Sequence, residues 1–173
     1  MEVALFEPRI PQNTGNIART CAAFNIPLNL IEPLGFKLED KYLKRAGLDY
    51  WPLVTVNKYF NFDKFSKSKQ PNRIISFSKK NGIYLKDFKF QKDDVLIFGR
   101  EDSGLPDCII DKSDFLISIF MPNLQTEANF QKGVRSLNLS VACGIAIYEA
   151  YKLINFQNDN LVQKMFYNIL RSR

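Results

Sequence analysis

The sequence predicts an α/β fold in which a parallel sheet is flanked by helices. Short apolar runs of strand length alternate along the chain with segments whose apolar residues recur at helical spacing. Hydrophobic residues make up 46% of the chain and charged residues 24%, values typical of a globular protein. With 173 residues, the chain is long enough for one domain with a substantial core and too short for two full domains.

The predicted strands are short runs of apolar, often β-branched or aromatic residues that lie between turn-forming residues. The run Val-Leu-Ile-Phe at 95–98 is wholly apolar, which is typical of a strand buried within a parallel sheet. The predicted strands are Val3–Glu7, Leu28–Ile31, Leu53–Val56, Arg73–Phe77, Val95–Phe98 and Phe115–Phe120.

Three helices are expected in the first half of the chain. The apolar residues of Gly15–Phe24 share one helical face, and Asn13 or Thr14 is the expected capping residue. A second helix is predicted over Leu38–Ala46, where the glycine that follows would end it. A short third helix is expected near Asp63–Ser66.

A long helix is predicted over Ser136–Leu153, with Ser136 as its N-cap. Its apolar residues lie on several faces, so the helix requires burial on several faces. One small domain rarely buries a helix so completely, and we therefore expect a subunit interface there. We expect residues 1–155 to form one domain and residues 156–173 to form a C-terminal helical tail.

The composition excludes several classes of chemistry. The chain has no histidine, which removes Ser-His-Asp triads, Cys-His pairs and histidine metal sites. The three cysteines, Cys21, Cys108 and Cys143, form no CxxC pair, so neither a zinc site nor a disulfide framework is expected. We expect them to be buried small apolar residues, and we expect no bound metal.

The sequence predicts a cytoplasmic protein that does not enter a membrane. The longest apolar runs fall short of the roughly 18 residues that a membrane helix needs. The N-terminus carries acids and prolines too early for a signal peptide, and unpaired cysteines suit a reducing compartment.

Positive charge is concentrated in the first half of the chain. The net charge is +6 overall, and it divides into +7 for residues 1–90 and −1 for residues 91–173. Within 58–89, nine lysines and arginines stand against two aspartates, with phenylalanines and tyrosines interleaved. Such a surface could follow an RNA backbone and stack on unpaired bases. The alternative is a solvated lysine-rich face over core aromatics, and the stretch by itself favours that alternative.

Ligands of parallel α/β sheets bind beyond the carboxyl ends of the strands, so we expect a site in the loops that leave the strands. The first such loop, residues 7–19, places Asn13, Asn16 and Arg19 around the start of a helix, where an anion binds favourably. An ordinary N-cap followed by a surface arginine explains the same residues equally well.

The second loop, Phe98–Pro106, follows the wholly apolar strand. Gly99 would let a ligand approach the backbone, and Gly104 would turn the chain into the next helix. The chain contains neither the GK[ST] ending of a P-loop nor a GxGxxG dinucleotide motif. A tight Asp-Ser-Gly turn without any ligand is the alternative.

The third loop, residues 134–140, leads into the long helix. Asn138 and Ser140 are unusual in so apolar a helix, because a buried polar side chain needs a partner. Either both bond to nearby backbone, or they face a ligand or the neighbouring loops.

Taken together, these segments resemble the SpoU branch of the SPOUT RNA methyltransferases. The matching segments are NTGNIAR (13–19), FGREDSGLP (98–106) and RSLNLSVACGIAIYEA (135–150). Between them, IEPLGF (31–36) and LKRAGLDYW (43–51) resemble the small bacterial members of this branch. Each motif alone is unspecific, but their order is highly specific, and the resemblance runs from about residue 2 to residue 154. The chain departs from the family pattern at 123–133, where the loop is longer and carries Glu127 and Lys132.

The resemblance implies a sheet whose C-terminal segment threads a loop to form a trefoil knot, which ordinary rules of chain topology make rare. It also implies a homodimer and the cofactor S-adenosylmethionine. By analogy with the family, the cofactor would contact residues that follow three strands and residues of the third loop. These residues are Phe77, Gly99, Glu101, Ile119, Met121, Ser136 and Leu137.

The implied reaction is methyl transfer from a sulfonium to a ribose 2′-hydroxyl of RNA. For the small bacterial members, the resemblance implies the wobble nucleotide, cytidine or uridine 34, in the anticodon stem–loop of leucine tRNAs. Arg19 would pair with a phosphate and stabilise the forming alkoxide, because a guanidinium stays protonated and cannot act as a base. Asn13 and Asn138 would orient Arg19 or the ribose. The expected RNA contacts are Arg9, Lys79, Lys80 and Tyr148.

Two other functions remain open from the sequence. The chain could be a non-catalytic RNA-binding protein with this fold, or a methyltransferase that acts on another ribose of tRNA or ribosomal RNA or on a small molecule. The presence of Arg19, Asn138 and both loop glycines favours an enzyme. The net charge of +7 in the first ninety residues argues against a small neutral substrate.

Overall fold

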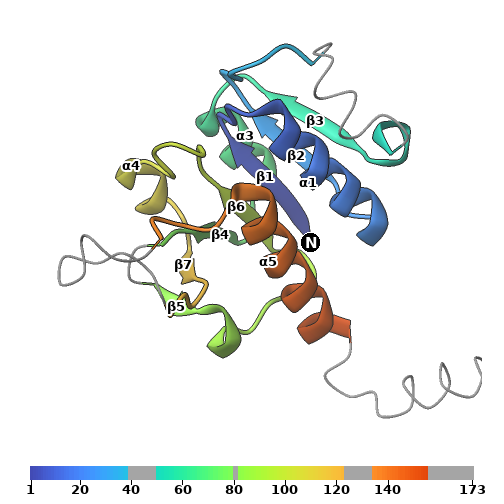
Figure 1. The fold of residues 1–173 in the computed structure, drawn as a ribbon. Coiled ribbons are helices and arrows are strands. Elements are labelled where there is room, and N and C mark those ends of the chain that lie inside the picture. Colours follow the sequence, from blue (N-terminus) through green and yellow to red (C-terminus); the bar gives the residue numbers. More distant parts are fainter. Residues whose placement is uncertain (39–49, 80–81, 123–133, 156–173) are drawn as a thin grey trace, which may run out of the picture.

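A computed structural model describes residues 1–38, 50–79, 82–122 and 134–155 (Figure 1). At its centre is a seven-stranded sheet in the order β3-β2-β1-β6-β4-β7-β5, in which every strand pair is parallel. The strands are β1 (Glu2–Phe6), β2 (Leu28–Ile31), β3 (Val56–Tyr59), β4 (Ile74–Phe77), β5 (Ile83–Tyr84), β6 (Val95–Phe98) and β7 (Phe115–Ser118). The predicted α/β fold with a parallel sheet is confirmed.

Helices cover both faces of the sheet. In Figure 1, α1 and α5 lie side by side on one face, and α3 lies on the opposite face. The helices are α1 (Pro11–Phe24), α3 (Phe62–Lys69), α4 (Asp107–Ile110) and α5 (Leu139–Asn155), with 3-10 turns at Trp51–Leu53 and Leu85–Asp87. The short helix expected near Asp63–Ser66 is therefore confirmed as part of a longer one.

Two apolar layers hold these helices to the sheet. Successive side chains of β1 point to opposite faces. Val3 and Leu5 belong to the buried cluster that includes residues of α1 and α5, whereas Ala4 and Phe6 belong to the cluster that includes residues of α3 and α4. The sheet is therefore the middle layer of three.

Helix α1 begins at Pro11 rather than Gly15, and the prediction that Asn13 or Thr14 caps it is wrong. Ile10 occupies the cap position without a side-chain hydrogen bond. Instead, the Glu101 carboxylate accepts hydrogen bonds from the backbone N–H of Arg9 at 2.8 Å and of Ile10 at 3.1 Å. A proline at the first helical position is already set in helical φ. The cap thus comes from a loop 91 residues away, where no local pattern could indicate it.

Helix α5 begins at Leu139, and its N-cap is Asn138 rather than Ser136. The Asn138 Oδ1 accepts from the backbone N–H of Ser140 at 2.9 Å and of Val141 at 3.4 Å, and from the Ser140 hydroxyl at 2.8 Å. The two polar residues that looked out of place therefore lie at the end of the helix, where polar side chains satisfy free backbone N–H groups.

Strand β3 lies at Val56–Tyr59, so the prediction of a strand over Leu53–Val56 is wrong by three residues. Pro52 has no N–H to contribute to a ladder, and Trp51–Leu53 forms a 3-10 turn. The register with β2 pairs Leu28 with Val56. The two-residue strand β5 was not predicted, because it is too short to show a pattern.

Cysteine burial follows the prediction at two of three positions. Cys21 and Cys143 are buried, and burial raises the pKa of Cys21 to about 12 and that of Cys143 well above its ordinary value. Cys108 is exposed, so its predicted burial is wrong. It lies in the single turn of α4, where Ile109 is the residue that enters the core.

Several predictions lie outside the described residues. They are the helix over 38–46 beyond Leu38, the long loop at 123–133 with the knot threading that depends on it, and the tail 156–173. Within the described ranges, no helix is long and apolar enough to cross a membrane. The same ranges contain no cluster of three or more cysteine, aspartate or glutamate side chains placed to hold a metal ion.

Candidate functional site

A cavity of about 430 Å³ lies beyond the carboxyl ends of β4, β6 and β7. The segments that follow these strands form three of its walls, and residues 136–139 at the start of α5 form another. This is the edge of the sheet at which parallel α/β folds bind ligands. The seven residues that the sequence assigned to the cofactor all line this cavity: Phe77, Gly99, Glu101, Ile119, Met121, Ser136 and Leu137.

A chain of hydrogen bonds joins the three motif loops at the cavity. The Asn13 Nδ2 donates to Glu101 Oε1 at 3.1 Å, and the Asn138 Nδ2 donates to Asn13 Oδ1 at 3.0 Å. Asn13 is only 5% exposed, and both of its polar atoms have partners in this chain. Because buried amides need such partners, each loop holds the next one in place.

The glycines of the second loop shape the loop itself. Residues 100 and 104 form a β-bridge, with hydrogen bonds of 3.1 and 2.9 Å between their backbones. A Cβ on Gly99 would lie 2.1 Å from the carbonyl carbon of Gly104, so the space at Gly99 is taken by the protein's own backbone. Gly99 still lines the cavity, so the approach of a ligand to its backbone stays a prediction. Gly104 has a φ of +73°, which confirms that it turns the chain.

The rim of the cavity carries a pair of arginines that share one carboxylate. Glu7, which follows β1, has a φ of 46°, an uncommon conformation for a residue with a side chain. Its carboxylate accepts from Arg100 and, at 3.5 Å, from Arg9. The predicted RNA contact Arg9 thus lies at the rim, with its backbone tied to Glu101 and its side chain paired with Glu7.

Arg19 does not line the cavity. It is exposed on α1, with its guanidinium 4.6 Å from the ring centre of Tyr50. Arg19 lies six positions after Asn13, which places it about 9 Å further along the helix axis and about 120° around it. Asn13 and Arg19 therefore cannot face the same cavity from one helix.

The remaining predicted RNA contacts are dispersed. Lys79 lines the cavity and is exposed, and Lys80 lies outside the described residues. Tyr148 is 59% exposed on α5, where it continues an exposed apolar row with Val141 and Ile145 at helical spacing. This row, Val141-Ile145-Tyr148, contains no residue of the cavity lining.

The basic stretch 58–89 divides into core and surface. Lys69 is 8% exposed and pairs with Glu2, and Arg73 pairs with Asp94 at 2.7 Å. The hydrogen bonds that Arg73 donates to the Asp94 carboxylate raise the pKa of Arg73. Most of its phenylalanines are buried: Phe62, Phe65, Phe77 and Phe88. The alternative of core aromatics is thus correct for these phenylalanines, whereas Lys69 is buried rather than solvated. Lys58 and Phe60 are exposed.

The cavity also contains residues that the sequence analysis did not assign, among them Ile10, Ser103 and Leu139. The Ser103 hydroxyl donates to the Asp102 carboxylate at 2.8 Å and lowers the pKa of Asp102. Asp102 therefore carries a negative charge at the cavity throughout the neutral range. Asp102 and Ser103 lie within the second motif (98–106), so that motif is the feature of the sequence that could have identified them.

Residues 1–148 match the model of the SpoU rRNA Methylase family. The chain belongs to this family. It is 41% identical over 154 residues to the tRNA (cytidine(34)-2′-O)-methyltransferase of Saccharophagus degradans, covering 89% of this chain and 96% of that relative. A solved structure from work on the 2-OH methylation of C/U34 on tRNA is 42% identical and superposes with a TM-score of 0.80, covering 88% of this chain and 94% of the other.

More distant family structures share the fold. The SpoU methyltransferase AviRb of Streptomyces viridochromogenes, solved in complex with AdoMet, is 20% identical to this chain. It superposes with a TM-score of 0.75 over 88% of this chain and 57% of its own. At this identity the likeness establishes the shared fold only.

Proposed function

We propose that the protein transfers a methyl group from S-adenosylmethionine to the ribose 2′-hydroxyl of nucleotide 34, cytidine or uridine, in tRNA. The observation that carries this proposal is a pair of hydrogen bonds in the lining of one cavity. They link Glu101 to Asn13 and Asn13 to Asn138, one residue from each motif loop. The relative from Saccharophagus degradans, which has 41% of its aligned residues in common with this chain, is a tRNA (cytidine(34)-2′-O)-methyltransferase. We further propose leucine tRNAs as substrates and the cytoplasm as the location.

The cavity fits the proposed cofactor in size and chemistry. Its volume of about 430 Å³ lies within the usual range for small-molecule sites, roughly 300–1,000 Å³. Phe77, Ile119 and Leu137 offer apolar surface for the adenosine, and Ser136 offers a hydroxyl. The ionised Asp102 lies in the same lining and suits a cationic ligand. When bound, S-adenosylmethionine supplies an electrophilic methyl group on a positively charged sulfur.

The chain's own residues position the ribose and its negative charge. We propose that Asn13 and Asn138 hold the loops and orient the ribose, since their amides are linked at 3.0 Å beside the cavity. The proton of the 2′-hydroxyl leaves to a phosphate or to water, because Arg19 stays protonated and cannot accept it. Arg19 instead neutralises a neighbouring phosphate and the developing alkoxide.

We propose that this arginine acts across a homodimer. Arg19 lies on the exposed side of α1, away from the cavity of its own chain. The exposed row Val141-Ile145-Tyr148 on the adjacent helix α5 is an apolar surface that a second copy would cover. In this arrangement the partner subunit's Arg19 serves the cavity of the first copy. The methyltransferase domain would comprise residues 1–155, followed by a helical tail at 156–173.

The direct test is methylation of tRNA in vitro. The purified protein is incubated with unmodified leucine tRNA and S-adenosylmethionine, and the nucleosides are analysed by mass spectrometry. We expect a new 2′-O-methylated cytidine or uridine that maps to position 34. The Arg19→Ala variant should bind the cofactor normally and produce none. Methylation at another position, or none with wild-type protein that binds the cofactor, would contradict the proposal.

A further inference from the structure

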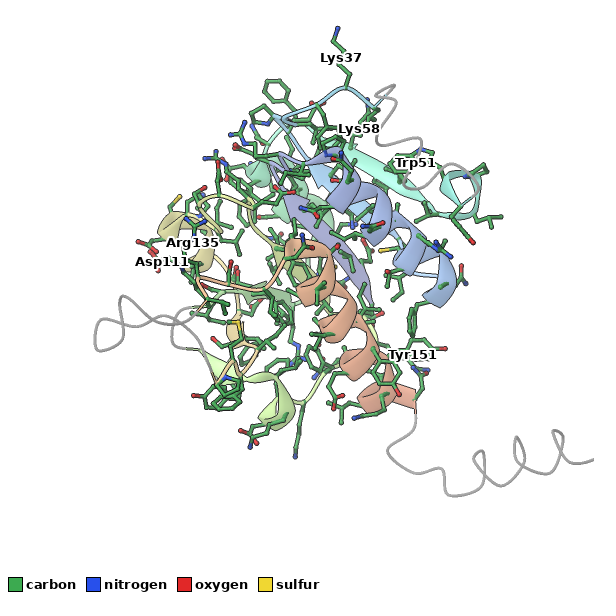
Figure 2. The ribbon with its side chains drawn as sticks, in the orientation of Figure 1. Lys37, Trp51, Lys58, Asp111, Arg135 and Tyr151 are labelled. Carbon is green, nitrogen blue, oxygen red and sulfur yellow. The ribbon has the colours of Figure 1, made fainter. Side chains whose placement is uncertain are left out.

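A second hollow lies on the same edge of the sheet, beyond the ends of β2 and β3. Its volume is about 590 Å³, and it shares no lining residue with the cavity described above. Its walls include Glu32, Leu34, Phe36, Lys37, Lys58 and Phe60. In Figure 2, Lys37 projects outward from the molecule above Lys58, so both ammonium groups are presented at this end.

The lining of this hollow combines an exposed aromatic ring with two lysines. Phe60 is 78% exposed, whereas its neighbour Tyr59 packs edge-on against Phe65 with the ring centres 5.3 Å apart. Alternate residues of a strand point to opposite sides, so Lys58 in β3 faces away from α3. Neither Lys37 nor Lys58 has an ion-pair partner within the described part of the chain, and Glu32 is the carboxylate of the lining.

A single short segment separates the hollow from the cofactor cavity. The Gly35 N–H donates to the Pro8 carbonyl at 2.9 Å, and a Cβ on Gly35 would lie 2.8 Å from the Arg9 Cα. The loop that follows β2 is therefore packed directly on the loop that follows β1. Arg9 in turn donates its backbone N–H to Glu101 in the cavity lining. Both depressions thus belong to one continuous edge.

We propose that the hollow defined by Lys37, Lys58 and Phe60 is a second RNA subsite. An unpaired base of the substrate stacks on the Phe60 ring, and the phosphates beside it lie at Lys37 and Lys58. This inference rests on the proposed function, because an RNA whose target ribose lies at the cofactor cavity continues along the same edge. Stacking on a phenylalanine ring tolerates any base, so the subsite holds a nucleotide that flanks the target and does not select it.

The test measures binding of a synthetic tRNA anticodon stem–loop that carries 2-aminopurine at single loop positions next to nucleotide 34. Phe60→Leu should raise its Kd roughly tenfold, the loss expected for one base stacked on an aromatic ring. The KM for this RNA should rise with it, while kcat at saturating RNA stays unchanged. Phe60→Tyr should restore both values. One 2-aminopurine position should be quenched by wild type and by Phe60→Tyr but not by Phe60→Leu.

The lysines are tested by salt dependence. Lys37→Ala and Lys58→Ala should each reduce the slope of log affinity against log salt concentration by about 0.7, the value for one phosphate contact to a single strand. Leu53→Ala and Lys112→Ala are the controls, because both residues are exposed. Each precedes a strand, so both lie at the edge of the sheet opposite to the hollow. Neither control should change the affinity or the salt slope.

The outcomes separate this subsite from the proposed function. The subsite would be overturned if the Phe60→Leu variant bound RNA as tightly as wild type does, with a normal melting temperature and normal binding of S-adenosylmethionine. This holds even if nucleotide 34 is methylated. A change of molecular mass in light scattering on Phe60→Leu would show that the hollow is an interface between copies, and would overturn it as well. If nucleotide 34 is not methylated but the Phe60 and lysine effects are found, the subsite is supported and the proposed function fails.

Discussion

At the scale of single residues, Glu101 links the second motif loop to the start of α1. Its carboxylate accepts from two backbone N–H groups before α1 and from the Asn13 amide. Glu101→Gln replaces one acceptor oxygen with a donor and removes a negative charge at a helix N-terminus. We expect the free energy of unfolding to fall by about 1–3 kcal/mol, measured by urea denaturation. Cofactor affinity, measured by calorimetry, should fall with it.

The control for Glu101 is an exposed carboxylate that lies outside the cavity lining. Asp63→Asn removes an exposed partner of Lys112, and an exposed ion pair contributes about 0–1 kcal/mol. If Glu101→Gln is no more destabilising than Asp63→Asn, then Glu101 does not cap α1.

The cysteines provide a second prediction for single residues. The thiolate is the reactive form, and burial raises the pKa of Cys21 and Cys143, so both remain protonated and inaccessible at neutral pH. We expect iodoacetamide to modify Cys108 alone in the native protein, as measured by peptide mass spectrometry. All three cysteines should react in denaturant. Native modification of Cys143 would show that α5 opens readily from the sheet.

At the scale of elements, the first turn of α5 combines a cap with a link to the neighbouring loop. Asn138 Oδ1 satisfies the backbone of α5, and its Nδ2 donates to Asn13. Asn138→Ala removes both roles and should lower the free energy of unfolding by about 1 kcal/mol or more. Asn138→Asp keeps the cap and loses only the donor to Asn13. We expect near-normal stability but strongly reduced turnover in Asn138→Asp, measured by thermal melting and by methylation kinetics.

The comparison of these two variants assigns the role of Asn138. Equal losses of stability in both would mean that the contact with Asn13 matters more to folding than the cap does. Normal turnover in Asn138→Asp would remove the Asn13–Asn138 link from the catalytic arrangement.

At the scale of the whole molecule, the row Val141-Ile145-Tyr148 determines the oligomeric state that we propose. Ile145→Glu places a charge in the middle of this apolar surface, where burial against a second copy would be costly. We expect a monomer in light scattering, with a normal circular dichroism spectrum and little activity. Leu53→Glu, at an exposed apolar residue far from this row in the sequence, is the control and should remain dimeric. A dimeric Ile145→Glu protein would place the interface elsewhere.

Mixed dimers test whether Arg19 acts on the cavity of the second copy. Arg19→Ala and Ser136→Trp should each be inactive, the first for lack of the guanidinium and the second because the indole fills the cavity. In a mixed dimer, the Arg19→Ala chain has an open cavity and the Ser136→Trp chain has an intact Arg19. We therefore expect activity to return when the two variants are mixed. Activity that stays absent in verified mixed dimers would assign Arg19 to its own chain.

The sequence was sufficient for the family and for most strands and helices, although β5 was missed and β3 was placed three residues too early. Strand β6 is predicted to the residue, because Val95–Phe98 is a continuous apolar run. The motif segments are close enough to the family pattern that residues near the ends of β4, β6 and β7 could be assigned to one site, and these residues do line one cavity. Local composition and ordered motifs carry this information without any knowledge of contacts.

The tertiary structure decided what depends on contacts between distant residues. The start of α1 is set by Glu101, which lies 91 residues from Ile10. The space at Gly99 is filled by the backbone of Gly104, and the Arg19 guanidinium lies over the ring of Tyr50. A hydrogen bond or steric contact across the chain leaves no periodic pattern in sequence. These features, and the hollow at Phe60, therefore follow only from the packing of the loops at one edge of the sheet.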